Sequence, residues 1–438
     1  MTVRAKVGRI RRAAGGSVVR RMGWGLADQA VSSLTNFVVG VVAARTLGAT
    51  DFGLFSLAWV TFGLVLNISR GLASDPVVVR FSGPADERWR EAVKRSTGTA
   101  VLIGCAGGAL CAVIGLAIGV GHGAVFVGLG VVLPFLVLQD CWRFAFFAAG
   151  RGRDAFVNDL VWGLALVPAL VVADRHPAAV WFVVAWGVSG GVAAAVGLVQ
   201  ARVVPDVTSV RRWVPDHRDL GLRYMVENVC QSGAGQLRMY GLGAIAGVAA
   251  VGTVRGGELL VGPFLAVLMG VNLVAVPEAT RVVRRAVGRL RAFCLVVGGA
   301  QWFAALCWGL GLLLLLPDGV GNYLLGSIWP EASRLVVPAT LTVMSAGLSS
   351  GASTGLRALG AAALGLRAQL VASAFYVTGG LLGAASGGAL GSAWGVAVGA
   401  LAGVAVWWWS LGVGVRRHRE GGGNEPGERL STGLEPRG

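Results

Sequence analysis

Long apolar segments alternate with short polar ones along almost the whole chain. A helix that crosses a bilayer needs about 20 mostly apolar residues, and its backbone groups must pair within the segment because lipid offers them no partners. The segments that meet this length are 22–46, 52–70, 96–120, 123–150, 155–174, 178–201, 219–248, 251–280, 291–316, 332–354, 358–386 and 390–415. The pattern therefore predicts an all-α integral membrane protein with twelve transmembrane helices.

The composition excludes an ordinary soluble enzyme. Of the 438 residues, 55% are hydrophobic and only 14% are charged, and the mean hydropathy is +0.69, whereas soluble domains carry about 25% charged residues. The six cysteines all fall inside apolar segments, without a CxxC pair or a histidine at ligand spacing. We expect them to be small buried side chains rather than ligands of a metal ion or members of a disulfide framework.

The net charge of +16 follows the expected membrane topology. Cytoplasmic loops of membrane proteins carry an excess of Lys and Arg. With the N-terminus in the cytoplasm, the inner segments hold 32 of the 38 basic residues. These segments are 1–21, 70–95, 151–153, 202–223, 281–291, 357–367 and the tail from 416. The basicity therefore indicates orientation, with both termini cytoplasmic, and not a nucleic-acid partner.

The chain divides into two similar halves. At a shift of 199 residues, Asp28-Gln29 aligns with Glu227-Asn228 and Gly53 aligns with Gly252. Six spans in each half insert the same way round, so a two-fold axis along the membrane normal and a central cavity between two lobes are expected. The predicted parts are a basic cytoplasmic N-terminus (1–21), an N-lobe (22–201), a cytoplasmic linker (202–218), a C-lobe (219–415) and a disordered cytoplasmic tail (416–438). The segment PADERWREAVKR (84–95) predicts a short amphipathic helix on the inner face.

Polar side chains follow one face of the first span of each half. Asp28, Ser32 and Asn36 recur every four residues, and Glu227 and Gln231 share a face with Arg238. Ionisable groups within spans generally face a bundle interior or a water-filled cavity. We expect Asp28 and Glu227 to face the cavity between the lobes; the alternative is that such groups join helices to one another.

Three stretches resemble one family of membrane proteins. AARTLGATDFGLFSLAW (43–59) is similar to the N-terminal signature of polysaccharide and O-antigen flippases. VLQDCWRFAFFAAGRGRDAFVNDL (137–160) resembles their junction of the fourth and fifth spans, and VGPFLAVLMGVNLVAVPEATR (261–281) resembles their eighth span. These flippases belong to the multidrug/oligosaccharidyl-lipid/polysaccharide (MOP) exporter superfamily. With the twelve-span layout, the resemblance covers residues 22–415.

The resemblance implies an alternating-access transporter of the bacterial cytoplasmic membrane, not an enzyme. Its cargo would be an oligosaccharide on a polyprenyl pyrophosphate, moved from the inner to the outer leaflet for cell-surface polysaccharide export. Such a cargo needs a hydrophilic cavity, cations for its phosphates and a lateral opening for its prenyl chain. The implied partners are this lipid-linked oligosaccharide, membrane lipids and other polysaccharide-assembly proteins, and we expect a monomer.

Eleven side chains are candidates for lining the cavity: Asp28, Gln29, Asn36, Arg45, Arg143, Glu227, Asn228, Gln231, Arg238, Arg255 and Glu258. Guanidinium groups suit phosphate oxygens bidentately. Each arginine also has a structural alternative. Arg143 is spaced to pair with Asp140 on its own helix, Arg255 is spaced to pair with Glu258, and Arg45 could extend to the outer interface.

The energy source is expected to be an ion gradient, the membrane potential or product removal. The sequence lacks the GxxxxGK[ST] phosphate loop, so no ATP hydrolysis of that type is expected. No bound cofactor is predicted, and Asp28 and Glu227 are the candidates for proton or sodium coupling. The alternative function is a cation-coupled multidrug exporter on the same fold. A membrane-embedded glycosyltransferase, polymerase or ligase is disfavoured, because the longest expected outer loop (317–331) carries only Asp318 and Glu331 as acids.

Overall fold

The computed structural model describes the backbone of residues 3–119 and 121–421, and the side chains of this range apart from residues 3–22, 266–270, 272–274 and 421. Within these residues every regular element is a helix. The chain forms two compact units, residues 1–259 with 317–334 and residues 260–316 with 335–438. The part of the second unit beyond residue 421 lies outside the described residues.

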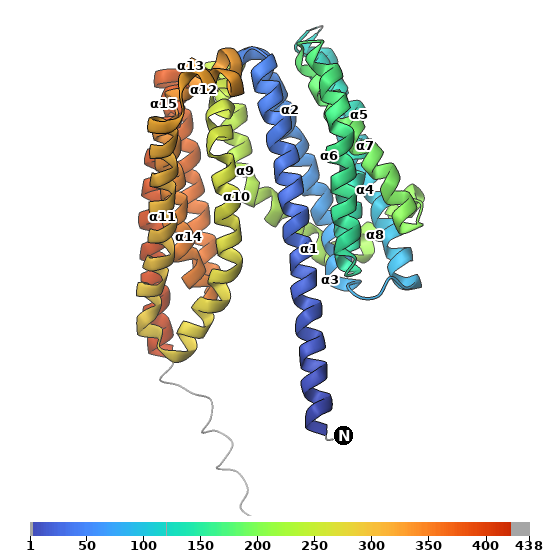
Figure 1. Ribbon diagram of the computed structural model, residues 1–438, viewed down its shortest axis with the longest axis vertical. Helices are drawn as coiled ribbons and strands as arrows, with labels where there is room; N and C mark the ends of the chain where they lie inside the picture. The colour runs from blue at the N-terminus through green and yellow to red at the C-terminus, as the bar shows by residue number, and fades with distance from the viewer. Residues whose placement is uncertain (1–2, 120, 422–438) are drawn as a thin grey trace, which may run out of the picture. The chain divides into compact units, whose positions relative to one another are not determined.

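The first unit holds most of the helices (Figure 1). They are α1 (Val3–Thr46), α2 (Ala49–Ser69), the π-helix η1 (Arg70–Ser74), α3 (Asp75–Arg80), α4 (Glu87–Ile118), α5 (Ala124–Ala148), α6 (Gly152–Asp174), α7 (Ala179–Ala201), η2 (Val207–Ser209), α8 (Val210–Asp216), α9 (Arg218–Ala246), the start of α10 (Val248–Arg285), α12 (Asp318–Leu325), η4 (Gly326–Ile328) and α13 (Trp329–Ser333). Helix α5 packs against α4 and α7, and α6 packs against α7 and α1. A core of large side chains around Trp89, Trp142, Phe146 and Trp213 holds α4, α5 and α8 together.

The second unit is a smaller bundle. It contains the rest of α10, η3 (Val287–Arg289), α11 (Leu290–Leu315), α14 (Val336–Ala358) and α15 (Ala362–Gly421). Helix α14 packs against both α11 and α15, and the three run side by side in Figure 1. Its core includes Leu290, Cys294, Leu356 and Leu411, each 1% exposed or less.

The described helices account for the twelve predicted spans. Nine of them are long and apolar enough to cross a membrane, and a tenth span is added if Asp318–Ser333 and Val336–Ala358, bent by 87°, count together. Helix α15 is two helices joined at a break at Gly387 and Gly388, where Gly388 takes a φ of 59° that favours glycine. The remaining predicted span is α9, which is 29 residues long. The mean hydropathy of α9 is lower than that of the other spans, because α9 carries several charged and amide side chains.

Three segments predicted outside the spans have more helical structure, or a different helical structure, than expected from the sequence. Residues 84–95 are not a separate amphipathic helix: from Glu87 they form the first turns of α4, which Asp86 caps by accepting from the Trp89 N–H at 2.9 Å. The predicted linker 202–218 contains α8. There Thr208 donates to Asp206, and this hydrogen bond holds the pKa of the Asp206 carboxyl below its usual value. The predicted tail 416–438 is helical to Gly421, and the rest of it lies outside the described residues.

A reciprocal contact joins the starts of α2 and α10. A Cβ at Gly53 would overlap the carbonyl oxygen of Val248, and a Cβ at Gly252 would overlap the carbonyl oxygen of Ala49. Gly53 and Ala49 are separated from Gly252 and Val248 by the same 199 residues that align the two halves. A contact in which each partner repeats the other's role is what a two-fold axis produces. This geometry supports the duplication expected from the sequence.

The compact units do not follow the boundaries of the predicted lobes, because α9 and the start of α10 cluster with the first six spans. The lobes 22–201 and 219–415 and the cavity between them stay predictions.

Candidate functional site

Three ionisable side chains from three helices meet inside the first unit. Both Nε and Nη2 of Arg143 (α5) reach the Oδ2 atom of Asp28 (α1), at 2.7 and 2.5 Å. The Arg143 Nε atom also lies 3.5 Å from the Oδ2 atom of Asp159 (α6). Asp28 is 0% exposed and Asp159 is 3% exposed, and the side chain of Arg143 is 15% exposed. We call Asp28, Arg143 and Asp159 the acidic cluster, because it contains two carboxyl groups and one guanidinium.

Amide side chains fix the position of Asp159. Gln139 (α5) donates from Nε2 to Asp159 Oδ1 at 2.7 Å and to Asn158 Oδ1 at 3.2 Å. Asn158 in turn donates to the carbonyl oxygen of Ala193 on α7 at 2.8 Å. These hydrogen bonds tie α5, α6 and α7 together around one carboxyl group. Among the described residues, the Oδ1 atom of Asp28 and the Oδ2 atom of Asp159 are both buried without a hydrogen-bond partner, so the cluster retains unused acceptors.

A further ion pair lies at the π-helix of the second span. Arg70 donates from Nε and Nη2 to the two carboxylate oxygens of Asp140, at 2.9 and 2.6 Å. This fork-to-fork geometry is the strong form of an arginine–carboxylate pair. π-Helical turns are rare and often occur at functional sites. Arg70 and Asp140 compensate one another, so they leave the charge balance of the acidic cluster unchanged.

A second cluster has the opposite balance. Arg238 (α9) pairs with Glu258 (α10) through Nη2, and Arg255 (α10) reaches the other oxygen of Glu258 at 3.1 Å. The side chain of Arg238 is 4% exposed, whereas those of Arg255 and Glu258 are 33% and 31% exposed. We call Arg238, Arg255 and Glu258 the basic cluster, because two guanidinium groups share one carboxylate.

Helix α9 is joined to the second span by polar contacts along its length. Asn228 donates to Asp75 at 2.9 Å, and Asn67 donates to Ser232 at 2.7 Å. Arg80 pairs with Asp219 at 2.6 Å. The backbones approach closely between these contacts, because a Cβ at Gly71 would overlap the backbone of Met225.

The structure brings together several candidates predicted from the sequence. Arg143 reaches the side-chain oxygen of Gln29 at 3.2 Å as well as Asp28, and Gln231 donates to Glu227 at 3.2 Å. Asn36 is half-buried, and the exposed Arg45 lies over the ring of Tyr323, 4.3 Å from its centroid. That Asp28 and Glu227 face one shared cavity stays a prediction: Asp28 is enclosed by protein, whereas Glu227 is exposed.

Two ion pairs within single helices are predicted as structural alternatives for the arginines, and the structure contains one of them. Arg255 pairs with Glu258, as its spacing indicates. The expected pairing of Arg143 with Asp140 is wrong, because Arg70 binds Asp140 and Arg143 turns to Asp28 and Asp159. The candidates drawn from the sequence do not include Asp159, Gln139 and Arg70. The signal that could have indicated Asp159 is the Asn158-Asp159 pair within an otherwise apolar segment.

Comparison with known proteins places the fold. No protein-family model matches the chain, and no curated protein matches it. Among solved structures, the lipid II flippase MurJ in its inward closed conformation is similar at a TM-score of 0.67 and 11% identity, covering 91% of this chain and 90% of that one. The inward-facing conformation of a multidrug resistance MATE family transporter of the MOP superfamily is similar at a TM-score of 0.59 and 14% identity, covering 91% and 96%. At these identities the likeness establishes the fold alone, and this chain is a multi-pass membrane protein with the fold of the MOP transporter superfamily.

Proposed function

We propose that this protein is an alternating-access flippase in the bacterial cytoplasmic membrane. Its cargo is a polyprenyl-pyrophosphate-linked oligosaccharide, moved from the inner to the outer leaflet for cell-surface polysaccharide export. The observation that carries the proposal is the basic cluster, in which Arg238 and Arg255 share the one carboxylate of Glu258 within the spans. The lipid II flippase MurJ shares this fold, which makes a lipid-linked cargo a reasonable one for the architecture.

The basic cluster suits a phosphate because its positive charge exceeds its negative charge. Arg255 forms a 3.1 Å pair with Glu258, and both side chains are about one third exposed. A phosphate oxygen can therefore replace the carboxylate as the partner of Arg255 without opening the buried core. Arg238 remains paired with Glu258 and holds it in position. A guanidinium that exchanges one anionic partner for another avoids the cost of an unpaired charge within the membrane.

The acidic cluster supplies a means of coupling to an ion gradient. Its two carboxyl groups face one guanidinium, so one proton or one sodium ion balances the charge. Among the described residues, Asp28 Oδ1 and Asp159 Oδ2 accept no hydrogen bond, and both are acceptors available for that cation. Carboxyl groups within spans serve in this way in proton-driven transporters. Asp28 and Asp159 are the residues proposed to take up and release the ion during the transport cycle.

Reconstitution tests the proposed cargo. The full chain is placed in liposomes with a fluorescent polyprenyl-pyrophosphate-linked oligosaccharide, and transfer between leaflets is followed by quenching from outside. We expect transfer by the wild type and at least a fivefold slower rate for Arg255→Gln, with unchanged transfer for Arg175→Gln, which alters an exposed arginine at the end of α6. Absence of transfer with every lipid-linked saccharide would refute the flippase.

The acidic cluster also fits a second function, a cation-coupled multidrug exporter, since cation uptake serves either cargo. The MATE family transporters that share this fold make this alternative concrete. The same liposomes loaded with a cationic dye distinguish the two. Dye efflux that depends on a proton or sodium gradient, without transfer of lipid-linked saccharide, would favour the exporter.

A further inference from the structure

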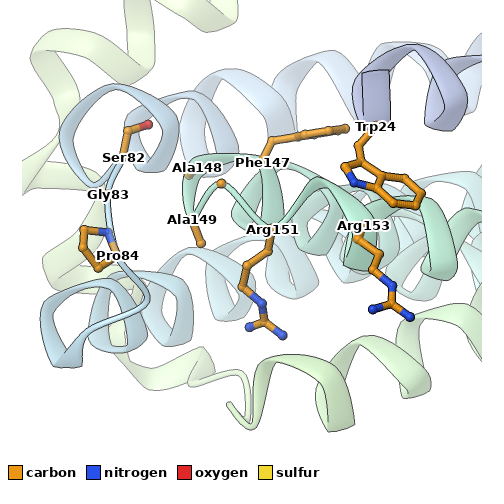
Figure 2. Close-up of a pocket in the computed structure, with 10 residues that line it drawn as sticks. Trp24, Ser82, Gly83, Pro84, Phe147, Ala148, Ala149, Arg151 and Arg153 are labelled. Carbon is orange, nitrogen blue, oxygen red and sulfur yellow. The ribbon is translucent and has the colours of Figure 1, made fainter. Parts of the chain in front are cut away.

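An open pocket lies where α1, the α3–α4 loop and the α5–α6 turn meet. Its volume is about 920 Å³. Figure 2 shows its lining side chains, with Arg151 and Arg153 next to one another and Trp24 beside Arg153. The lining residues are Trp24, Ser82, Gly83, Pro84, Phe147, Ala148, Ala149, Gly150, Arg151 and Arg153. None of them belongs to the acidic or the basic cluster, and we call this cavity the arginine pocket.

A smaller cavity of about 390 Å³ adjoins it, because Arg151 lines both. The smaller cavity adds Arg90 from α4 and Arg202 from the end of α7. Four arginines from three segments of the chain therefore line two neighbouring cavities that share Arg151. This grouping differs from the scattered basic residues of an ordinary cytoplasmic loop.

The two arginines of the pocket differ in how they are held. Arg151 donates from Nε to Asp154 at 2.6 Å and from Nη2 to the carbonyl oxygen of Gln200 at 2.8 Å. These bonds fix its position, and Asp154 offsets its charge. Arg153 is exposed, and among the described residues it forms no ion pair. A fixed guanidinium beside a free one provides a preformed place for an anion.

The pocket has an apolar wall and lies at the ends of three candidate spans. The candidate spans Gly23–Thr46, Ala124–Ala148 and Gly152–Asp174 all have one end there. Trp24 and Phe147 form part of the wall, and Val199 on the rim of the smaller cavity is 76% exposed. Amphipathic rings such as that of tryptophan favour the headgroup level of a bilayer. An inorganic anion would gain nothing from this apolar wall, whereas a lipid would use both the wall and the arginines.

We propose that the arginine pocket binds the phosphodiester headgroup of an anionic phospholipid. Arg153 contacts the phosphate, and Arg151 orients it. The distribution of Lys and Arg places these helix ends in the cytoplasmic leaflet, where anionic headgroups are attracted to basic recesses between spans. This site is separate from the basic cluster and does not depend on the identity of the transported cargo.

Lipid retention by the intact protein tests the site. The full chain is exchanged into mixed vesicles of phosphatidylglycerol and phosphatidylcholine, extracted in mild detergent, and weighed by native mass spectrometry. We expect the wild type to retain phosphatidylglycerol preferentially. Arg153→Gln should lower this retention about fivefold, as loss of one basic residue near an anionic surface implies. The matched control is Arg175→Gln, an exposed arginine just beyond the other end of the same helix, which should retain as much as the wild type.

A variant that keeps every charge provides a second test. A Cβ at Gly83 meets no atom within 4 Å, so Gly83→Leu adds a side chain to the recess without a clash at Cβ. It should lower phosphatidylglycerol retention by occupying the pocket, with unchanged thermal stability. Retention by both Arg153→Gln and Gly83→Leu at the wild-type level would overturn the proposal. Equal losses in Arg153→Gln and Arg175→Gln, or displacement of the lipid by millimolar inorganic phosphate, would overturn it as well.

Discussion

The acidic and basic clusters have the same composition with the signs of charge reversed. In the acidic cluster two carboxyl groups share Arg143, and in the basic cluster two guanidinium groups share Glu258. The first is built from helices of the first half of the sequence and the second from the first two helices of the second half. The two halves of the sequence therefore differ in the charge that each places within its spans. An excess of negative charge suits a cation, and an excess of positive charge suits a phosphate.

The clusters also differ in enclosure. The acidic cluster joins α1, α5 and α6, and its carboxyl groups are at most 3% exposed. The basic cluster joins only α9 and α10, and two of its three side chains are about one third exposed. Burial makes ion pairs costly to break, because a charge left without a partner cannot be solvated. The acidic cluster is therefore expected to matter for folding and transport, and the basic cluster chiefly for transport.

Removal of the shared arginine is expected to have the largest effect. Arg143→Ala leaves Asp28 and Asp159 buried without a cation, and loss of one partner of a buried pair costs about 3–5 kcal/mol. We expect a loss of that size in the free energy of unfolding, measured by denaturant titration of the purified protein in detergent. The same measurement on Arg255→Ala should give less than about 1 kcal/mol, because a partly exposed pair contributes little. Equal losses in the two variants would refute the difference in enclosure.

A smaller loss of stability is expected where the two halves meet. Gly53→Ala and Gly252→Ala each place a Cβ against a carbonyl oxygen of the other helix. Overpacking of this kind costs about 1–3 kcal/mol, and the reciprocal geometry implies similar costs for the two variants. Thermal unfolding of both would measure it. Gly233→Ala on α9, where a Cβ meets no atom within 4 Å, is the control. A cost confined to one of the two glycines would argue against the two-fold relation.

Neutralisation of either acid in the acidic cluster should alter coupling more than folding. Asp28→Asn and Asp159→Asn each leave one carboxylate facing Arg143, so the balancing cation is no longer required. We expect cation-driven transport in liposomes to fall at least tenfold, which corresponds to about 1.4 kcal/mol, and its dependence on pH or sodium to disappear. Asp154→Asn alters a carboxylate outside the cluster and should leave the dependence intact. An unchanged dependence in both cluster variants would remove the acidic cluster from the mechanism.

The sequence predicts interactions along one helix better than those between helices. Hydropathy indicates most of the spans, because these are long and apolar on their own. The pair of Arg255 and Glu258 is predicted by its spacing, since residues three apart are neighbours on a helix. The same spacing misassigns Arg143, whose partners come from α1 and α6. Asp159 lies in an apolar segment with no periodic signal, and only the packing of α6 against α1 and α5 shows what it faces.

The smallest expected effect tests the basic cluster as a site for a phosphate. Arg255→Gln removes one guanidinium but leaves Glu258 paired with Arg238, so folding should be retained. Loss of one partly exposed ionic contact is worth about 1 kcal/mol, and we expect about a fivefold higher KM for the lipid-linked saccharide in the liposome assay. The pH or sodium dependence should stay that of the wild type, because the acidic cluster is intact. Arg255→Lys keeps the charge without the planar fork and should recover part of the affinity. A change in the pH or sodium dependence together with KM would contradict the assignment of cargo binding to the basic cluster and of coupling to the acidic cluster.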